Sequence, residues 1–424
     1  MKKVLIISYY FPPSGFVGGE RVYSWYNYLL QNGYYPIIIT RNWDVNQKDE
    51  TKSATLNKLS VEKTEKGEIH RLPYNQNLRD RLVSKMGFFS YFIRKFLTFT
   101  ELITIKFSMV QCPYENIYTY SKEFLSNHPD CEILIISGKP FNSFRFGYLL
   151  KKKFKNINWI ADYRDEWTTM NNDYHKFSLA KLIWKIDNIY EKKWIKTASF
   201  FTTTSDKIIN RINKLTGVNG FLVLNGFDTI ESLNPSKTNN DTLSFLYSGT
   251  LYNYQRIELF IELVKKVNKR NLGMKINLYL IGVDVIAKEK ERVMKLVQGD
   301  SNFIILERMT KSELLKYYEK IDCFYLTSYE QHIGWLPVKI FDYVAYHKNI
   351  LLYPSDNDIM EKFIKDTQSG YSTTDARYCE QLMLELIQQK LANGFVAVNH
   401  NLNEIEKYSR KSQTKVLSKA LNSI

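Results

Sequence analysis

Cysteine and histidine are scarce in this sequence, and both shortages exclude classes of protein. Its 424 residues contain four cysteines and six histidines. The cysteines show no paired spacing, which argues against a disulfide framework or a zinc module and suits a reducing compartment. The histidines show no ligand spacing, so we expect no bound metal. The four cysteines are Cys112, Cys131, Cys323 and Cys379.

Long apolar runs are also missing. No uncharged stretch reaches the roughly 18 residues that a membrane-spanning helix needs. The opening MKKVLIISYYFPP has a basic start, but its apolar run is short and is closed by prolines. We interpret it as a first strand rather than a signal peptide. We expect a cytoplasmic protein, with the inner face of the cytoplasmic membrane as a further location.

Positive charge and aromatic side chains, by contrast, are abundant. The formal net charge is +15, and aromatic residues make up 15% of the chain. A basic surface attracts nucleic acids, anionic lipid surfaces or phosphorylated substrates. Composition alone does not choose among these partners, so the choice depends on where the cations lie.

Short runs rich in β-branched residues recur along the chain and alternate with segments of helical length. This pattern predicts an α/β fold with parallel sheets covered on both faces. The polar residues 229–241 interrupt the series, and we expect two Rossmann-like domains, 1–225 and 226–400. The basic segment 401–424 is expected to be helical and either to close the second domain or to cross back onto the first. The runs are KVLIIS, YPIIIT, CEILIIS, INWIAD, FFTTTS, FLVLN, LSFLYSG, KINLYLIG, NFIILE, CFYLTS and NILLYP.

The first strand-to-helix turn, YYFPPSGFVGGERVYSW, is rich in glycine and proline. Gly15, Gly18 and Gly19 do not have the G-x-G-x-x-G spacing of a dinucleotide fingerprint. A loop of this length can offer backbone amides to an anion, or its glycines can serve turn geometry alone. Glu20 and Arg21 follow at the expected helix start, where Arg21 either touches substrate or braces the loop.

A second charged turn follows the strand in WIADYRDEW. Asp162, Arg164 and Asp165 are expected at the carboxyl end of that strand, where doubly wound sheets bind ligands. A carboxylate there can orient or deprotonate a sugar hydroxyl, and Arg164 can hold it ionised or bind a phosphate. The alternative is a structural Asp–Arg pair that caps the next helix.

Two stretches of the second half indicate a nucleotide-sugar site. In LYSGTLYNYQR, Gly249 and Thr250 allow close backbone approach and Arg256 adds a fixed charge. In LPVKIFDYVAYHKNILLYP, Lys339 and Asp342 share a helix face. A lysine for phosphate and an acid for ribose hydroxyls is what such a ligand requires, although a lone pair of this kind is often a surface ion pair.

The SDND stretch at residues 355–358 contains an Asp-x-Asp pattern found in metal-dependent transferases. It follows a strand, and Ser and Asp in that place are typical of a helix cap. We therefore interpret the stretch as a cap.

Two basic aromatic stretches lie in the first half, at residues 79–107 and 181–196. Such helices can lie in a membrane interface with their cations on anionic head groups, or can pack their aromatic rings on the sheet. Nucleic acid is disfavoured, since neither stretch joins a recognisable binding module. The residues expected at a membrane surface are Phe88, Phe89, Phe92, Arg94 and Lys95.

In this order the motifs resemble family 4 of the retaining GT-B glycosyltransferases, particularly bacterial enzymes of polysaccharide and lipopolysaccharide assembly. The matching stretches are YYFPPSGFVGGERVYSWYNYLLQNGY, ADYRDEW, LNGFD, YSGTLYNYQR and LPVKIFDYVAYHKNIL.

The resemblance implies a nucleoside-diphosphate sugar donor held mainly by the C-terminal domain and an acceptor, a glycan or lipid-linked glycan, held mainly by the N-terminal one. Gly18 and Gly19 would face the donor phosphates, Arg256 and Lys339 would hold the diphosphate, and Asp342 would bind the ribose. Transfer would retain the anomeric configuration without an obligatory metal or other cofactor. The leaving phosphate would take the acceptor proton.

The sequence departs from the family pattern at the donor-sugar motif. The family often has two glutamates with seven residues between them; here Asp342 replaces the second and Gly334 the first, while Glu330 lies four residues too early. A nucleotide-sugar epimerase or hydrolase, and a non-catalytic sugar-nucleotide-binding subunit, remain as alternatives.

Overall fold

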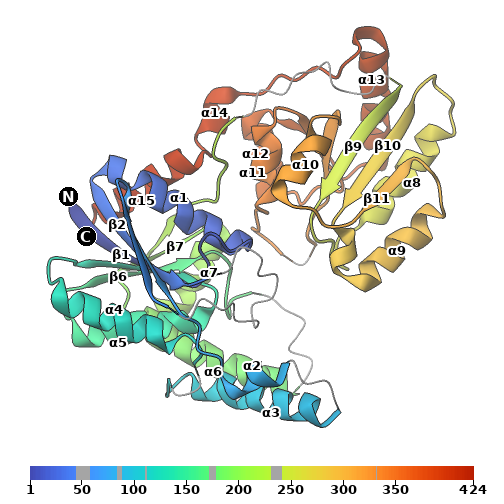
Figure 1. Ribbon diagram of the computed structural model, residues 1–424. Helices are drawn as coiled ribbons and strands as arrows, with labels where there is room; N and C mark the ends of the chain where they lie inside the picture. The colour runs from blue at the N-terminus through green and yellow to red at the C-terminus, as the bar shows by residue number, and fades with distance from the viewer. Residues whose placement is uncertain (44–57, 84–87, 110–111, 171–177, 231–240, 331) are drawn as a thin grey trace. The chain divides into compact units, whose positions relative to one another are not determined.

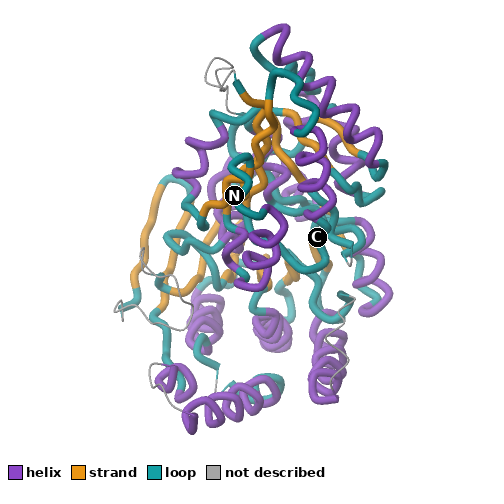
Figure 2. The backbone as a smooth tube through the Cα atoms, turned by 90° about the vertical axis from the view of Figure 1, so that its right-hand side faces the viewer, coloured by secondary structure: helices purple, strands orange, loops and turns teal. Residues whose placement is uncertain are grey.

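The computed structural model describes residues 1–43, 58–83, 88–109, 112–170, 178–230, 241–330 and 332–424 (Figure 1). The chain divides into two compact units. Unit 1 comprises residues 1–224 and 410–424, and unit 2 comprises residues 225–409. Each unit is built from strands and flanking helices (Figure 2).

The sheet of unit 1 contains eight strands among the described residues, in the order β3-β4-β2-β1-β5-β6-β7-β8. Neighbouring strands pair in parallel, except that β3 and β4 are antiparallel. The strands are β1 (Lys2–Ser8), β2 (Tyr34–Arg41), β3 (Ser60–Thr64), β4 (Gly67–Leu72), β5 (Ile133–Gly138), β6 (Asn158–Tyr163), β7 (Phe200–Thr203) and β8 (Gly220–Leu222).

Both faces of this sheet are buried, because successive residues of a strand point to opposite sides. Leu5 and Ile7 of β1 join one apolar core, whereas Val4 and Ile6 join another. Helices α4, α5, α6 and α7 supply side chains to the first core, and α1 and α15 supply them to the second. The unit 1 helices are α1 (Glu20–Tyr28), α2 (Leu78–Val83), α3 (Phe88–Thr104), α4 (Glu115–Asn127), α5 (Phe144–Lys153), α6 (Ser178–Ile195), α7 (Asp206–Thr216) and α15 (Arg410–Leu421).

The sheet of unit 2 is parallel throughout its described strands, in the order β11-β10-β9-β12-β13-β14. This is the doubly wound order in which the winding direction reverses between the first and fourth strands, here β9 and β12. The strands are β9 (Thr242–Ser248), β10 (Lys275–Ile281), β11 (Phe303–Leu306), β12 (Cys323–Leu326), β13 (Asn349–Leu352) and β14 (Gly370–Ser372). The helices are α8 (Ile257–Asn268), α9 (Ala287–Val297), α10 (Lys311–Tyr318), α11 (Lys339–Ala345), α12 (Ile359–Thr367), α13 (Ala376–Asn393) and α14 (Leu402–Glu406).

The predicted α/β fold with two parallel-sheet, Rossmann-like units is confirmed. The C-terminal segment differs in detail from the single helix expected there: it forms α14 and α15, separated by residues 407–409. Within unit 1, α15 packs on α1, and Leu417 and Leu421 are buried in the second core. None of the described helices is long and apolar enough to cross a bilayer.

Candidate active site

The carboxyl ends of β9 and β12 flank the point in unit 2 where the winding reverses, which is where doubly wound sheets bind ligands. Gly249 follows β9 with a φ of 102°, a left-handed conformation that favours glycine. A Cβ at Gly249 would lie 3.4 Å from the Nζ of Lys339, the first residue of α11. We call Gly249, Thr250, Arg256, Glu330 and Lys339 the strand-end site.

The ammonium group of Lys339 is the most unusual group of this site. Its Nζ lies 3.8 Å from the ring centroid of Tyr247. It is buried and has no hydrogen-bond partner among the described residues. Burial lowers the pKa of Lys339 to about 7, because an apolar environment disfavours the charged form. A buried donor without a partner is costly in a folded protein, so this group is suited to an anionic ligand.

Asp342 does not pair with Lys339 in the described structure. Its carboxylate lies 3.4 Å from the Nζ of Lys311, at the start of α10. The two side chains of α11 are therefore engaged differently, and the surface ion pair considered from the sequence does not form.

Arg256 precedes α8 and is half-exposed. Its guanidinium pairs with Glu258 at 2.5 Å and lies 3.7 Å from Glu330, which follows β12. These carboxylates raise the pKa of Arg256 above its ordinary value. A fixed cation therefore lies close to the segment that follows β12.

Buried tyrosines that the sequence reasoning missed hold the strand-end site in shape. The Tyr247 hydroxyl donates to the carbonyl of Thr250 at 2.9 Å, and the Tyr343 hydroxyl accepts from the Ser248 amide at 2.8 Å. An aromatic cluster lies alongside, with ring centroids 4.5–6.5 Å apart. The sequence indicated these residues only through its high aromatic content, 15% of the chain. The cluster comprises Tyr252, Tyr254, Tyr329, His332 and Trp335.

In the SDND stretch, the two aspartates have different partners. Asp356 accepts hydrogen bonds from the amides of Met360 and Glu361 at 2.9 and 3.0 Å, as a helix cap does. Asp358 instead accepts from the Gly334 amide at 2.7 Å. Gly334 is the position at which the family motif would place its first glutamate, so Asp358 brings a carboxylate to that part of the backbone.

In unit 1, Arg21 and Asp162 form a buried ion pair. The Arg21 Nε donates to the Asp162 carboxylate at 2.9 Å, and both side chains are almost completely buried. Ser137 and Thr202 also donate to Asp162, each at 2.8 Å. Asp162 thus has no exposed surface, and the structure favours a bracing function for this pair. Its catalytic assignment stays a prediction.

Arg164, two residues further, lies on the backbone of the neighbouring strand end. Its Nε donates to the Gly138 carbonyl at 2.5 Å, and its Nη2 lies 3.4 Å from the Lys139 carbonyl oxygen. A Cβ on Gly18 would overlap the Arg164 guanidinium, so a larger residue at this position would have to displace the end of the Arg164 side chain. Asp165 pairs with Lys139 at 3.1 Å. The structure therefore brings Gly18, Arg164 and Asp165 to one edge of the sheet.

Gly19 and Glu20 complete the first turn. A Cβ on Gly19 would lie 3.0 Å from the Phe11 Cα, so a larger residue at this position would require the backbone of Phe11 to shift. Glu20 pairs with Arg410, the first residue of α15, at 2.8 Å. The roles of these residues towards a donor or acceptor stay predictions.

In the ranges that the structure describes, no group of three or more His, Cys, Asp or Glu side chains is placed to hold an ion. The expectation of transfer without an obligatory metal remains a prediction.

Two Rossmann-like units, each with charged side chains at its strand ends, define the GT-B class of fold. Residues 228–411 match the family described as "Glycosyl transferases group 1", a segment nearly coextensive with unit 2. This match confirms the predicted class of enzyme, a glycosyltransferase. No curated protein matches the sequence.

Solved structures with the same fold are similar over the whole chain. Sucrose-phosphate synthase from Thermosynechococcus elongatus is 13% identical, with a TM-score of 0.65 over 100% of this chain and 99% of that one. The Anabaena protein HepE, solved with UDP-glucose, is 10% identical, with a TM-score of 0.61 and full coverage of both chains. A lipopolysaccharide outer core galactosyltransferase is 13% identical, with a TM-score of 0.53 over 100% and 99%. At these identities the likeness concerns the fold.

Proposed function

We propose that this protein is a retaining glycosyltransferase of the family 4 type. It transfers a sugar from a nucleoside-diphosphate sugar to a lipid-linked glycan during the assembly of a surface polysaccharide. The acceptor suggests a place at the inner face of the cytoplasmic membrane. The observation that carries the proposal is the Lys339 ammonium, which lies buried beside Gly249 without a hydrogen-bond partner among the described residues, within the segment that matches the glycosyltransferase family.

The donor diphosphate would bind at the strand-end site. Lys339 and Arg256 supply two cations, and the left-handed Gly249 leaves room for a phosphate next to the Lys339 ammonium. A diphosphate would favour the charged form of Lys339 and raise its pKa from about 7. Asp342 would accept from the ribose hydroxyls.

In the reaction, the bond between the anomeric carbon and the donor phosphate breaks, and a bond from the acceptor oxygen to that carbon forms on the same face of the sugar. The acceptor proton passes to the leaving phosphate oxygen, so no protein base is required. Negative charge grows on the diphosphate as it leaves. Lys339 and Arg256 stabilise the transition state, in which this charge has grown, more strongly than they stabilise the ground state. Fixed cations accelerate such a step in this way.

The test is binding and transfer with a panel of UDP-, GDP- and dTDP-sugars and lipid-linked acceptors. We expect one donor to bind, the product to keep the anomeric configuration by NMR, and Arg256→Ala to weaken binding. Lys362→Met is the matched control, because Lys362 is an exposed residue of α12 that pairs with Asp366. Failure of every nucleotide sugar to bind would refute the proposal. Binding with hydrolysis alone would favour the hydrolase or epimerase alternative, and binding without turnover the non-catalytic one.

A further inference from the structure

Helices α3 and α6 of unit 1 expose large apolar side chains to solvent. On α3, Tyr91, Phe92 and Phe96 are 45%, 54% and 65% exposed. On α6, Leu182 and Ile189 are 49% and 63% exposed. The two helices are neighbours (Figure 1). The alternative that these aromatic rings pack on the sheet is therefore wrong for Phe92 and Phe96. Phe88 and Phe89 begin α3, but their side chains lie outside the described residues.

Cations accompany the apolar side chains on both helices. Residues 91, 92, 95 and 96 share one face of α3 by their spacing, and Lys95 lies on that face with its Nζ 4.5 Å from the Tyr91 ring centroid. The lysines of α6 follow the same face as Leu182 and Ile189. The exposed lysines of this helix and its end are Lys181, Lys185, Lys192, Lys193 and Lys196.

The acids of α6 point the other way. The Asp187 carboxylate pairs with the buried ammonium of Lys106 at 2.5 Å. Glu191 is completely buried and accepts from the hydroxyl of Tyr163 at 2.9 Å and the amide of Thr168 at 3.0 Å. Helix α6 therefore turns its acids into unit 1 and its lysines towards solvent.

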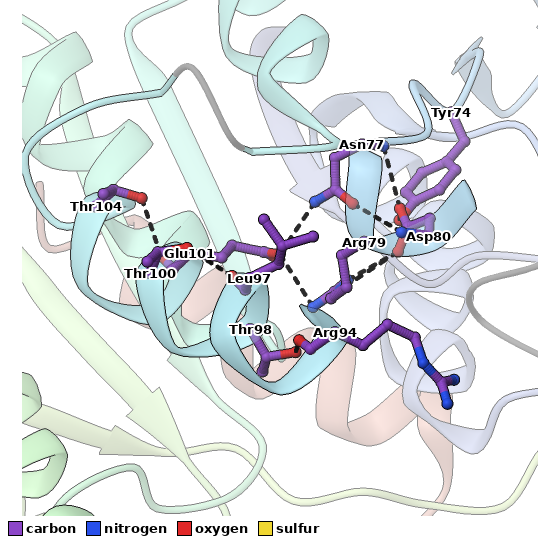
Figure 3. Close-up of polar contacts among 10 residues, drawn as sticks. All are labelled: Tyr74, Asn77, Arg79, Asp80, Arg94, Leu97, Thr98, Thr100, Glu101 and Thr104. Atoms are coloured by element: carbon purple, nitrogen blue, oxygen red, sulfur yellow. Dashed lines mark hydrogen bonds and ion pairs between the residues drawn. The ribbon is translucent and has the colours of Figure 1, made fainter. Parts of the chain in front are cut away.

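Helix α3 is arranged in the same way (Figure 3). Its acid, Glu101, pairs with Arg79 of α2 at 3.0 Å, and Arg79 also pairs with Asp80 at 3.0 Å. Asp80 accepts from the Tyr74 hydroxyl at 2.7 Å, which ties α2 to the segment after β4. Figure 3 shows the Arg94 guanidinium extending away from this network. The acids of both helices are thus neutralised inside the protein.

We propose that α3 and α6 form one docking surface for an anionic lipid bilayer. The exposed cations of this surface are complementary to anionic head groups, and its exposed apolar side chains are complementary to the hydrocarbon layer below them. The acids, which would be repelled, are turned inward. The α2–α3 network ties α3 to the segment that follows β4, so docking would hold this part of unit 1 near the membrane. The inference rests on the proposed function in one respect, because a lipid-linked acceptor is the reason for this enzyme to bind a membrane. Binding of the surface to vesicles is measured without sugar transfer.

The experiment is cosedimentation of the full chain with phosphatidylcholine vesicles that contain or lack phosphatidylglycerol. We expect binding to the anionic vesicles, weakened by salt because the charge attraction is screened. Each lysine near the surface contributes about fivefold to the binding constant, so Lys181→Gln/Lys185→Gln/Lys192→Gln should weaken it about 100-fold. Phe92→Ser/Phe96→Ser should weaken it about tenfold or more.

Matched controls come from exposed residues of unit 2. Leu391→Ser/Phe395→Ser removes apolar side chains that are 52% and 44% exposed. Lys288→Gln/Lys295→Gln removes two exposed charges of α9. We expect both control variants to bind like the wild type. All the substituted side chains are exposed, so unchanged thermal unfolding will show that the variants fold.

Equal binding to neutral and anionic vesicles, or undiminished binding of the α3 and α6 variants, would overturn the inference. Self-association would overturn it as well. In that case sedimentation equilibrium would show oligomers of the wild-type protein that are lost in Phe92→Ser/Phe96→Ser, and the wild-type protein would not bind vesicles. The two proposals fail separately. If only the docking proposal fails, sugar transfer to a short acceptor that dissolves without detergent persists. If only the transferase proposal fails, vesicle binding persists.

Discussion

Lys339 is expected to affect ligand binding and stability in opposite directions, and Lys339→Met separates the two effects. Methionine retains an unbranched apolar side chain against Tyr247 and removes the charge. The ammonium that it replaces is buried and has no hydrogen-bond partner among the described residues. We therefore expect the variant to bind a nucleoside diphosphate more weakly, with unfolding stability equal to that of the wild type or higher.

The size of the binding effect follows from the loss of one charged hydrogen bond. Such a bond contributes about 1.5–3 kcal/mol, so the Kd for the preferred nucleoside diphosphate should rise about 10- to 150-fold. With a pKa of about 7, about half of Lys339 is charged at pH 7 and about 1% at pH 9. If the ligand binds the charged form, wild-type affinity should fall about 50-fold across this interval. The terminal phosphate itself titrates at about pH 6, below this interval.

The stability effect has a definite pH dependence. The pKa of Lys339 lies below its ordinary value of 10.5 in the folded protein. Between these two values the unfolded chain binds more protons than the folded one, so the contribution of Lys339 to stability rises with pH in this window. Below about pH 7 the penalty for burying the charge is fully present. The stability advantage of Lys339→Met should therefore be greatest near neutral pH and shrink towards pH 10.5.

Titration calorimetry with UDP, GDP and dTDP from pH 6.5 to 9 measures the first effect, and urea unfolding over the same range measures the second. Lys362→Met should change neither, because Lys362 is an exposed member of a surface ion pair. An unchanged Kd and pH slope in Lys339→Met would refute the assignment of this ammonium to the diphosphate. Destabilisation by more than about 1 kcal/mol would show that it serves the folded unit instead.

Three further substitutions test other parts of the two units. Gly249→Ala should destabilise the protein by about 1 kcal/mol or more, because φ is 102° there, and should weaken nucleotide binding measured by calorimetry. Lys390→Met leaves the buried Asp322 carboxylate, now 2.6 Å from the Lys390 Nζ, without its cation; urea unfolding should show a loss of about 3–5 kcal/mol. Asp162→Ala strands the buried Arg21 and should cost a similar amount; normal stability with lost transfer would instead support a catalytic Asp162.

The alternation of apolar strands and helices was sufficient to predict the fold. All eleven runs identified from the sequence overlap strands of the structure. Three of the described strands were missed: the edge strand β3 is polar and largely exposed, its neighbour β4 alternates apolar with polar residues, and β14 has three residues. Short strands and strands with a polar face have only a weak hydrophobic pattern in the sequence. These strands could therefore be identified only from the three-dimensional structure.

The strand ends predicted the location of the candidate site better than its contacts. Gly249 and Lys339 are expected in one site from the sequence, and in the structure a Cβ added to Gly249 would lie 3.4 Å from the Lys339 Nζ. The hydrogen bond between Arg21 and Asp162 could not be predicted from the sequence, because the two residues are 141 positions apart. The ion pair between Lys311 and Asp342 could likewise not be predicted from the sequence. Side-chain partners depend on which strands are neighbours, and spacing along one element does not contain that information.

The other buried lysines of unit 2 show why the unpaired state of Lys339 points to a ligand. Lys390 donates to both carboxylate oxygens of Asp322, and Lys348 donates to the carbonyl of Glu319 at 3.2 Å. The fold can therefore satisfy a buried ammonium with its own groups, as buried charges require. Lys339 lacks such a partner among the described residues and lies where the winding of the sheet reverses. Because an unsatisfied cation lowers stability, its presence at this position is best explained by an anion that binds there during function.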